Sequence, residues 1–192
     1  MEQEQLRQTI SQAQAGQAEA YRTLMEEYAP RLYGYFFRST RSHHDAEDLL
    51  GEMMLRLVKN LKKYDDRGRF EPWLFRIAAN MVRDRIRRKK TAPTRISLFK
   101  EEDEGLSLGD SLEANNKPVD HRMQLAEASV ELQAALEKLD GTTREMILLR
   151  HFGQMSFKEI AGIFDCPLGT VLARVHRGVK SLRKIMGATD GA

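Results

Sequence analysis

Arg174, His176 and Arg177 are the chemically active side chains of the stretch TVLARVHRG, near the C-terminal end of the sequence. A guanidinium group can hold a backbone phosphate or the acceptor edge of a guanine base. Leu172 and Ala173 stand beside them and carry no side-chain hydrogen-bonding group, although apolar side chains pack against thymine methyl groups. The chemistry that this group of residues indicates is DNA contact.

The elements that must position these residues are typical of a helix-turn-helix, whose second helix enters the major groove with its N-terminal end. Ser156 followed by Glu159 has the spacing of a capping box and predicts the start of a short helix. Residues 165–167 predict a turn, with Cys166 as a small buried filler, and a second helix is expected to begin near residues 168–170. Its inward face is predicted from helical spacing to hold Val171, Val175, Val179, Leu182 and Met186. The alternative is an ordinary helical hairpin with a solvated basic face.

A second group of reactive side chains, in the stretch SHHDAED, suggests a metal-dependent nuclease as an alternative. It would use His43, His44, Asp45 and Glu47. Adjacent histidines on a helix point about 100° apart, so they converge poorly on one ion. Cys166 is the one cysteine of the chain, which argues against a zinc site built on several thiolates. We therefore predict no catalytic residue, no metal and no cofactor.

Size and charge distribution favour a protein of two small domains. The chain has 192 residues, of which 41% are hydrophobic, and it has no apolar run near the ~20 residues of a membrane span. Its polar N-terminal stretch lacks the apolar core of a signal peptide, so we expect a cytoplasmic protein without membrane insertion. Residues 80–90 hold six Lys or Arg against one Asp, whereas residues 100–120 hold seven Asp or Glu against two Lys. A basic block followed by an acidic one divides the chain into parts with different partners.

Helical periodicity dominates outside the middle of the chain, so the fold class predicted is all-α. A first helix is expected from about Ala18 to Tyr28 and should stop near Pro30. Ser42 predicts the cap of a later helix, whose buried stripe is expected to include Met53 with Met54 beside it. The stretch EPWLFRIAANMVRDRIRRKK predicts a long helix with Trp73 packed in the core.

Two long stretches together resemble a bacterial RNA polymerase sigma factor of the extracytoplasmic-function group. They are DAEDLLGEMMLRLVKNL…YDDRGRFEPWLFRIAANMVRDRIRRKK and LDGTTREMILLRHFGQMSFKEIAGIFDCPLGTVLARVHRGVKSLRK, with an acidic linker between them. The resemblance covers roughly residues 18–186 and implies two helical domains joined by a flexible linker. The boundaries expected are residues 1–90 for sigma domain 2, 91–121 for the linker, 122–187 for sigma domain 4, which contains the helix-turn-helix, and 188–192 for a tail.

The resemblance also implies partners and site residues. The expected partners are core RNA polymerase and promoter DNA, with an anti-sigma factor as a further candidate. The expected function is promoter-specific initiation of transcription, and the alternative is a stand-alone helix-turn-helix regulator. Residues implied for core polymerase binding are Asp48 and Glu52; for the −10 element, Tyr64, Arg69, Asn80, Arg83, Arg87 and Arg88; for the −35 element, Thr170, Leu172, Ala173, Arg174, His176 and Arg177.

Three positions depart from the family pattern. Gly51 stands where members often carry Gln, and glycine is a poor helix former that offers no side chain to a partner. Leu172 and Ala173 replace the basic residue and the serine of many relatives. The sequence therefore predicts a −35 element read through Arg174, Arg177 and apolar or shape contacts.

Overall fold

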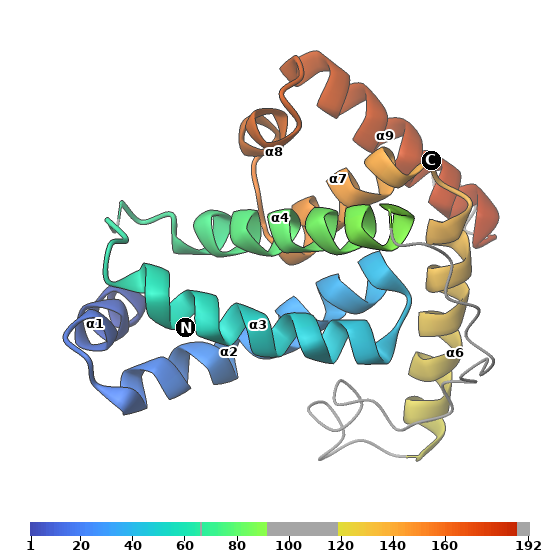
Figure 1. The fold of residues 1–192 in the computed structure, drawn as a ribbon. Helices are drawn as coiled ribbons and strands as arrows, with labels where there is room; N and C mark the ends of the chain where they lie inside the picture. The colour runs from blue at the N-terminus through green and yellow to red at the C-terminus, as the bar shows by residue number, and fades with distance from the viewer. Residues whose placement is uncertain (66, 92–118, 188–192) are drawn as a thin grey trace. The chain divides into compact units, whose positions relative to one another are not determined.

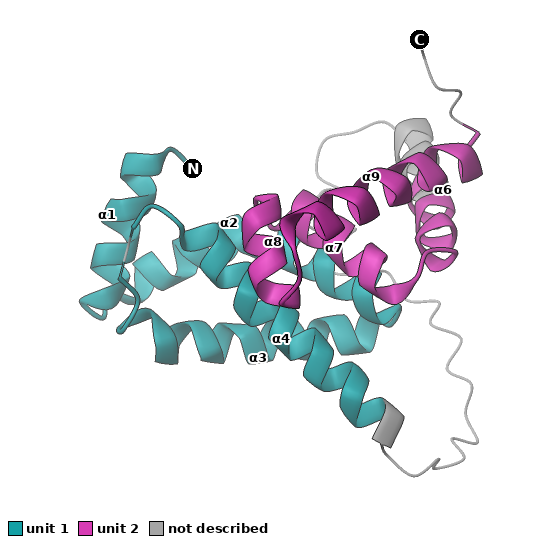
Figure 2. Ribbon diagram, turned by 90° about the horizontal axis from the view of Figure 1, so that it is seen from above, with its two compact units in different colours: residues 1–109 teal, residues 110–192 magenta. Residues whose placement is uncertain are grey.

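The computed structural model describes residues 1–65, 67–91 and 119–187, and these residues form α-helices joined by short connections, without a strand among them (Figure 1). The all-α prediction is confirmed. The chain divides into two compact units, residues 1–109 and 110–192 (Figure 2). The predicted linker falls almost wholly on residues 92–118 and the predicted tail on residues 188–192, and both lie outside the described residues.

Four helices build the first unit within its described residues. They are α1 (Gln3–Gln14), α2 (Ala18–Thr40), α3 (His43–Leu61) and α4 (Phe70–Thr91). Helix α2 packs against each of the other three, and α3 packs against α4. Their shared core is built from large side chains that are almost fully buried: Leu24, Leu32, Tyr35, Phe36, Met53, Leu57, Leu61, Phe70, Leu74 and Phe75.

The prediction that a helix stops near Pro30 is wrong, because α2 continues through Pro30 to Thr40. A proline inside a helix removes one backbone hydrogen bond and costs ~3 kcal/mol or more. Leu24, Tyr28 and Leu32 lie on both sides of Pro30 and are fully or almost fully buried. Burial of apolar side chains, at ~1.5–3 kcal/mol each, outweighs the local penalty.

Helix α1 was not predicted, because its sequence QEQLRQTISQAQ is mostly polar. Its buried side is narrow and is formed by Thr9, Ile10 and Ala13. The positive N-terminal amino group of Met1 also lies 3.0 Å from the carboxylate of Glu27 on α2. These contacts hold α1 on the first unit.

A partly buried ion pair fixes the start of α4 against α2. Arg31 donates to both carboxylate oxygens of Glu71, at 3.0 and 2.9 Å, and Tyr28 donates to the same carboxylate at 3.3 Å. Burial, together with the negative charge of Glu71, raises the pKa of Tyr28 well above its ordinary value. Tyr28 therefore stays a hydrogen-bond donor, and the first turn of α4 has one well-defined position.

The second unit contains α6 (Val119–Glu137), α7 (Gly141–Phe152), α8 (Phe157–Phe164) and α9 (Leu168–Ile185). Ser156 and Glu159 form the predicted capping box at the start of α8, and Pro167 precedes α9. Helix α9 packs against each of the other three helices. Its buried side chains are Val171, Val175 and Leu182, which confirms most of the predicted inward face.

Two details of the predicted helix-turn-helix are wrong. Met186 is 40% exposed, because α9 ends at Ile185 and the chain leaves the core there. Cys166 is only half-buried. It lies in the turn that follows Asp165, whose backbone conformation is left-handed, and it does not lie beneath that turn. The position that does pack tightly is Gly178, where an added Cβ would lie 2.6 Å from the methyl group of Thr143.

Candidate nucleic-acid interface

An open cavity of about 310 Å³ lies between α3, α4 and the loop that joins them. Of the residues expected at a −10 site, Tyr64 and Asn80 line it. Sequence reasoning missed the other lining residues, which are Arg56, Asn60, Lys63, Trp73 and Ile77. The helical spacing of 56 and 60 on α3, and of 73, 77 and 80 on α4, is the signal that could have found them. The cavity combines aromatic walls, two amide side chains and two cations.

Trp73 is half-buried in this cavity, so the prediction that it packs in the core is wrong. Its indole ring lies 4.5 Å from the ring of Tyr64 and 5.6 Å from that of Phe70, measured between centroids. Phe70 is fully buried and packs against both rings. One aromatic cluster therefore leads from the core to the cavity, which Tyr64 and Trp73 line.

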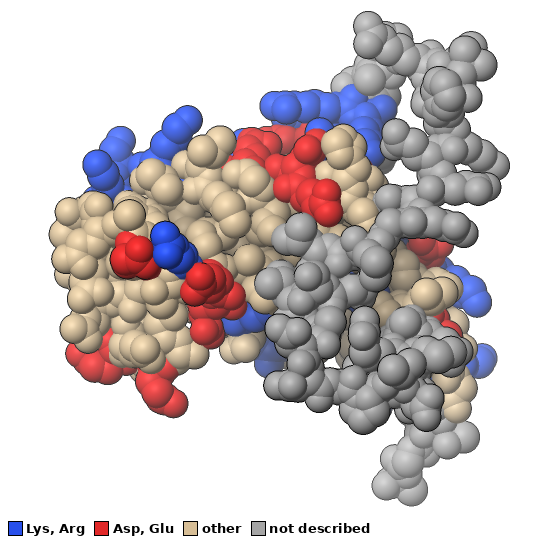
Figure 3. Space-filling model, turned by 90° about the horizontal axis from the view of Figure 1, so that it is seen from below, with Lys and Arg blue, Asp and Glu red and all other residues tan. Residues whose placement is uncertain are grey.

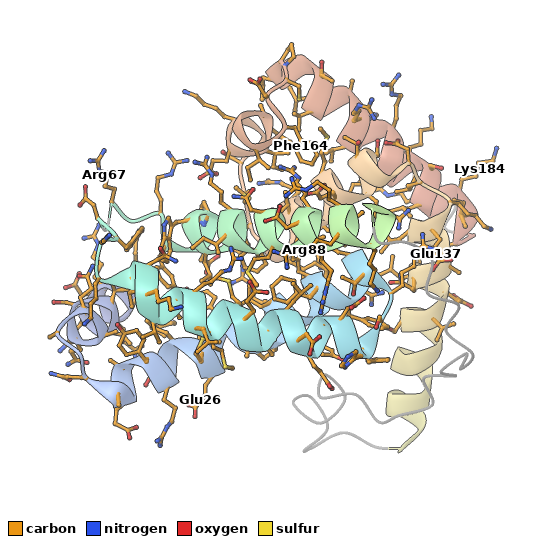
Figure 4. All side chains as sticks on the ribbon, in the orientation of Figure 1. Glu26, Arg67, Arg88, Glu137, Phe164 and Lys184 are labelled. Atoms are coloured by element: carbon orange, nitrogen blue, oxygen red, sulfur yellow. The ribbon has the colours of Figure 1, made fainter. Side chains whose placement is uncertain are left out.

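The expected phosphate-binding residues are not part of this cavity. Arg69 is exposed just before α4, and its backbone carbonyl accepts the first helical hydrogen bond, from Trp73. Arg83 is half-buried on α4, whereas Arg87 and Arg88 are exposed further along the same helix (Figure 4). Arg87 also contacts Asp84 at 2.9 Å. The exposed guanidinium groups extend the cationic character of the cavity toward the C-terminal end of α4.

Asp48 and Glu52, the residues expected to bind polymerase, are about half exposed on one face of α3. Both are engaged within the unit: Asp48 accepts from Arg85 of α4 at 2.7 Å, and Glu52 accepts from Arg56 at 2.7 Å. Arg85 was not singled out from the sequence. Its partners lie on another helix, and sequence spacing cannot reveal such a pairing.

Apolar side chains extend this face of α3 beyond the two carboxylates. Leu55 is 64% exposed and Val58 47% exposed. Met54, expected beside the buried stripe, is 37% exposed instead. Successive side chains of a helix point about 100° apart, so Met54 points away from the core that Met53 enters. Gly51 lies among these residues, and a Cβ built on it would meet no atom within 4 Å. The face therefore offers apolar area flanked by negative charge, a composition typical of a protein-binding surface.

The first turns of α9 present most of the residues expected to read a −35 element. Thr170, Ala173, His176 and Arg177 are exposed, and Leu172 is 43% exposed. Leu168, which sequence reasoning did not assign, is 46% exposed at the start of the same helix. Leu168 and Leu172 are four residues apart and share a face, so this end of α9 has an apolar edge.

Arg174 differs from its neighbours, because its guanidinium group is turned toward α7. It donates to the carboxylate of Asp140 at 3.1 Å and to the hydroxyl of Thr143 at 3.3 Å. Asp140 caps α7 by accepting from the backbone N–H of Thr143. Hydrogen bonds from Thr143, together with the charge of Arg174, hold the pKa of Asp140 below its ordinary value. Arg174 thus links α9 to the N-terminal end of α7.

The residues of the nuclease alternative do not converge. The Nδ1 atom of His43 lies 2.6 Å from the hydroxyl of Tyr33, and its ring stacks on Phe37 with centroids 4.3 Å apart. Asp45 is buried against Arg85 and Lys89. Within the described ranges, no group of three or more His, Cys, Asp or Glu side chains is placed to hold a metal ion. The same ranges contain no helix that is both long and apolar enough to span a membrane.

Two family models match the chain, one in each unit. Sigma-70 region 2 matches residues 24–91, which include α3, α4 and the cavity between them. Sigma-70 region 4 matches residues 129–182, which include the helix-turn-helix of α8 and α9. The chain therefore belongs to the sigma-70 family of RNA polymerase sigma factors, and within it to the extracytoplasmic-function (ECF) group.

The group follows from relatives of similar length. The chain is 31% identical over 179 residues to the ECF RNA polymerase sigma factor SigW of Bacillus subtilis. The match covers 93% of this chain and 95% of SigW. Its fold is similar to that of CnrH, solved in complex with the cytosolic domain of CnrY, with 23% identity, a TM-score of 0.62 and coverage of 96% and 98% of the two chains. It is also similar to RpoE of Bartonella quintana, solved with the anti-sigma factor NepR, with 19% identity, a TM-score of 0.62 and coverage of 91% and 100%.

Proposed function

We propose that this sigma factor binds its partners through three surfaces. The outer face of α3 binds core polymerase, the α3–α4 cavity binds the −10 element, and the first turns of α9 bind the −35 element. The observation that carries the proposal is the cavity, which brings Tyr64, Trp73 and Asn80 together within the region that matches Sigma-70 region 2. The role is that of an initiation factor in the bacterial cytoplasm, and it requires no catalytic step from this chain.

The cavity has the size and chemistry to receive a single base taken out of the DNA stack. Extruding a base costs a few kcal/mol, which stacking and edge contacts must offset. Stacking on an aromatic side chain contributes ~1–3 kcal/mol per base, and Tyr64 and Trp73 both line the cavity. Asn80 offers an amide that donates and accepts, so it can distinguish base edges. Lys63 supplies positive charge for the phosphate of that nucleotide, and Arg56 does so only after leaving Glu52.

The basic residues of α4 hold the DNA backbone in this proposal. Arg69, Arg83, Arg87 and Arg88 contact phosphates and fix the register of the strand, but they do not read its sequence. On the face drawn in Figure 3, Asp and Glu side chains lie interspersed with Lys and Arg among wide uncharged areas. The net charge of the chain is only +3, which gives little non-specific attraction to DNA. Promoter recognition by this chain therefore depends on assembly with the polymerase.

The −35 surface reads DNA through Thr170, Leu172, Ala173, His176 and Arg177. Arg177 supplies the guanidinium for a guanine edge or a phosphate, and Leu172 with Ala173 packs against thymine methyl groups. Arg174 reaches a phosphate only after leaving Asp140. The proposal therefore gives it a weaker part in DNA contact than Arg177.

Core polymerase binds the outer face of α3 in this proposal. Leu55 and Val58 supply apolar area, and Asp48 and Glu52 supply charge that orients the complex. An anti-sigma factor is a further partner that we propose, because two proteins of similar fold were solved with partners: CnrH with the cytosolic domain of CnrY, and the sigma factor RpoE with the anti-sigma factor NepR.

The proposal is tested with holoenzyme assembled from core polymerase and the full chain. Tyr64→Ala and Asn80→Ala should leave holoenzyme assembly unchanged and lower promoter opening, measured by the reactivity of unpaired thymines to permanganate. Asn80→Ala should also weaken discrimination among bases in the −10 element. Thr23→Ala removes an exposed polar side chain from α2 and serves as the control. Normal opening and discrimination by both cavity variants would remove the −10 site from this cavity.

The stand-alone regulator makes a different prediction in the same experiment. It requires the free chain to bind promoter duplex tightly at physiological salt, without core polymerase. The match of the first unit to Sigma-70 region 2 supports the sigma factor instead.

A further inference from the structure

Helix α1 lies outside the residues that match Sigma-70 region 2, yet it contacts the loop that forms one wall of the cavity. The side-chain amide of Gln14 donates to the backbone carbonyl of Leu61 at 3.0 Å and to that of Tyr64 at 2.6 Å. Leu61 ends α3, and its carbonyl also accepts from the backbone N–H of Tyr64 at 3.0 Å. One amide therefore joins the end of α3 to Tyr64, a loop residue that lines the cavity.

The far end of the same loop also lies against α1. Gly68 adopts a left-handed conformation with φ of 71°. A Cβ built on Gly68 would lie 3.5 Å from Nε2 of Gln3 and 3.6 Å from Nη2 of Arg7. Gln3 and Arg7 precede Gln14 on α1, so both ends of the loop meet one helix (Figure 1).

The position of the Tyr64 backbone determines the shape of the cavity. The Tyr64 ring packs on Trp73 with centroids 4.5 Å apart and on Phe70 with centroids 5.6 Å apart. A shift of the Tyr64 carbonyl away from Gln14 moves this ring relative to Trp73. The hydrogen bonds of Gln14 therefore help to determine the relative position of the Tyr64 and Trp73 rings, on which a base would stack.

We propose that α1 is a positioning element of the base-binding cavity, and that Gln14 is the residue through which it acts. This inference rests on the proposed −10 function of the cavity. Gln14 does not touch DNA in this account; it holds the Tyr64 wall in the conformation that accepts an extruded base. Preorganisation of this kind favours binding, because the ordering cost is met before the base arrives.

The test replaces Gln14 by methionine, which has a similar length and no N–H donor. Gln12→Met is the matched control, because Gln12 is exposed on the same helix. Trp73 is the only tryptophan of the chain, so quenching of its fluorescence reports on the cavity without any DNA. Core binding and promoter opening are then measured with the assembled holoenzyme, alongside Tyr64→Ala.

We expect Gln14→Met to make Trp73 more accessible to a quencher and to lower promoter opening about thirtyfold, which is the combined contribution of two ordinary hydrogen bonds. Core binding should be unchanged, and Gln12→Met should behave as the unmodified protein. Three results would overturn the inference. If Tyr64→Ala lowers opening but Gln14→Met does not, α1 has no positioning role. If Gln14→Met lowers core binding to the same degree as opening, its role is general folding. If neither variant lowers opening, the cavity is not the base site and the proposed function fails as well.

Discussion

Arg85 of α4 donates to Asp48 of α3 across 2.7 Å, and its Nε atom lies 3.3 Å from the carboxylate of Asp45. Lys89 reaches the same carboxylate of Asp45. The pairings join the start of α3 to the second half of α4. The helix proposed to bind polymerase and the helix proposed to bind DNA are thus fixed to each other by charge as well as by packing.

Asp45→Asn should destabilise the first unit. Asp45 is 5% exposed, and its carboxylate accepts a hydrogen bond from Lys89 and forms an ion pair with the Nε atom of Arg85 at 3.3 Å. A hydrogen bond to a charged group contributes ~1.5–3 kcal/mol, and the exposure of Lys89 reduces that value while the half-buried Arg85 adds to it. We expect a loss of about 2 kcal/mol in the free energy of unfolding. Urea denaturation followed by circular dichroism measures it, and Glu47→Gln, on the exposed residue nearby, is the control. Equal midpoints for the two variants would show that the pairings contribute nothing.

Substitution of two helical glycines by alanine should change stability in opposite directions. Gly51 has open space around its Cβ position, so Gly51→Ala should stabilise α3 by about 1 kcal/mol through helix propensity. Gly178→Ala places a methyl group 2.6 Å from Thr143 and 2.7 Å from Ile147, and should destabilise the second unit by ~1–3 kcal/mol. Denaturation midpoints of both variants test the pair. Stabilisation by both would mean that α7 and α9 are further apart than described.

Leu172→Arg should change the −35 preference of the holoenzyme. The substitution replaces an apolar side chain by a bidentate donor that favours guanine, and a good bidentate pair discriminates bases by ~1–3 kcal/mol. Competition among promoter duplexes that vary only in the −35 element measures the preference. Lys184→Arg, on the last turn of α9, is the control. An unchanged preference would remove Leu172 from the DNA surface.

Asp140→Ala should destabilise the second unit at neutral pH and much less in acid. The carboxylate caps α7 and pairs with Arg174, and loss of a cap costs ~1 kcal/mol. Its pKa is lowered from the ordinary value of 3.8. The folded state therefore gains stability above that value, and loses the gain as pH falls through the lower folded pKa. Thermal melts of variant and parent at neutral pH and below pH 3.8 measure the difference, which should shrink in acid. A constant difference would assign the effect to packing.

The sequence was sufficient to predict the helical fold, the helix-turn-helix and the family. Capping at Ser42 and Ser156 and the spacing of Val171, Val175 and Leu182 are local signals, and the structure confirms them. Region 2 and region 4 of the family were likewise recognisable from contiguous motifs.

What the sequence did not reveal depends on contacts between distant residues. The pairing of Arg174 with Asp140 spans 34 positions, and that of Gln14 with Tyr64 spans 50. Trp73 was misjudged because its spacing with Leu74 and Ile77 is the same for a core face and for the rim of a cavity. Helix α1 was missed because its buried side is small, so hydrophobic periodicity is weak there.

The central claim is that α3 binds core polymerase, and co-elution of the full chain with core polymerase on size exclusion tests it most directly. The double variant Asp48→Lys, Glu52→Lys is compared with Glu19→Lys, Glu26→Lys, which makes the same charge change on exposed carboxylates of α2. Figure 4 labels Glu26. We predict that the parent and the α2 variant co-elute with core polymerase and that the α3 variant does not, while all three stay folded. Equal co-elution of both variants would contradict the assignment of this face.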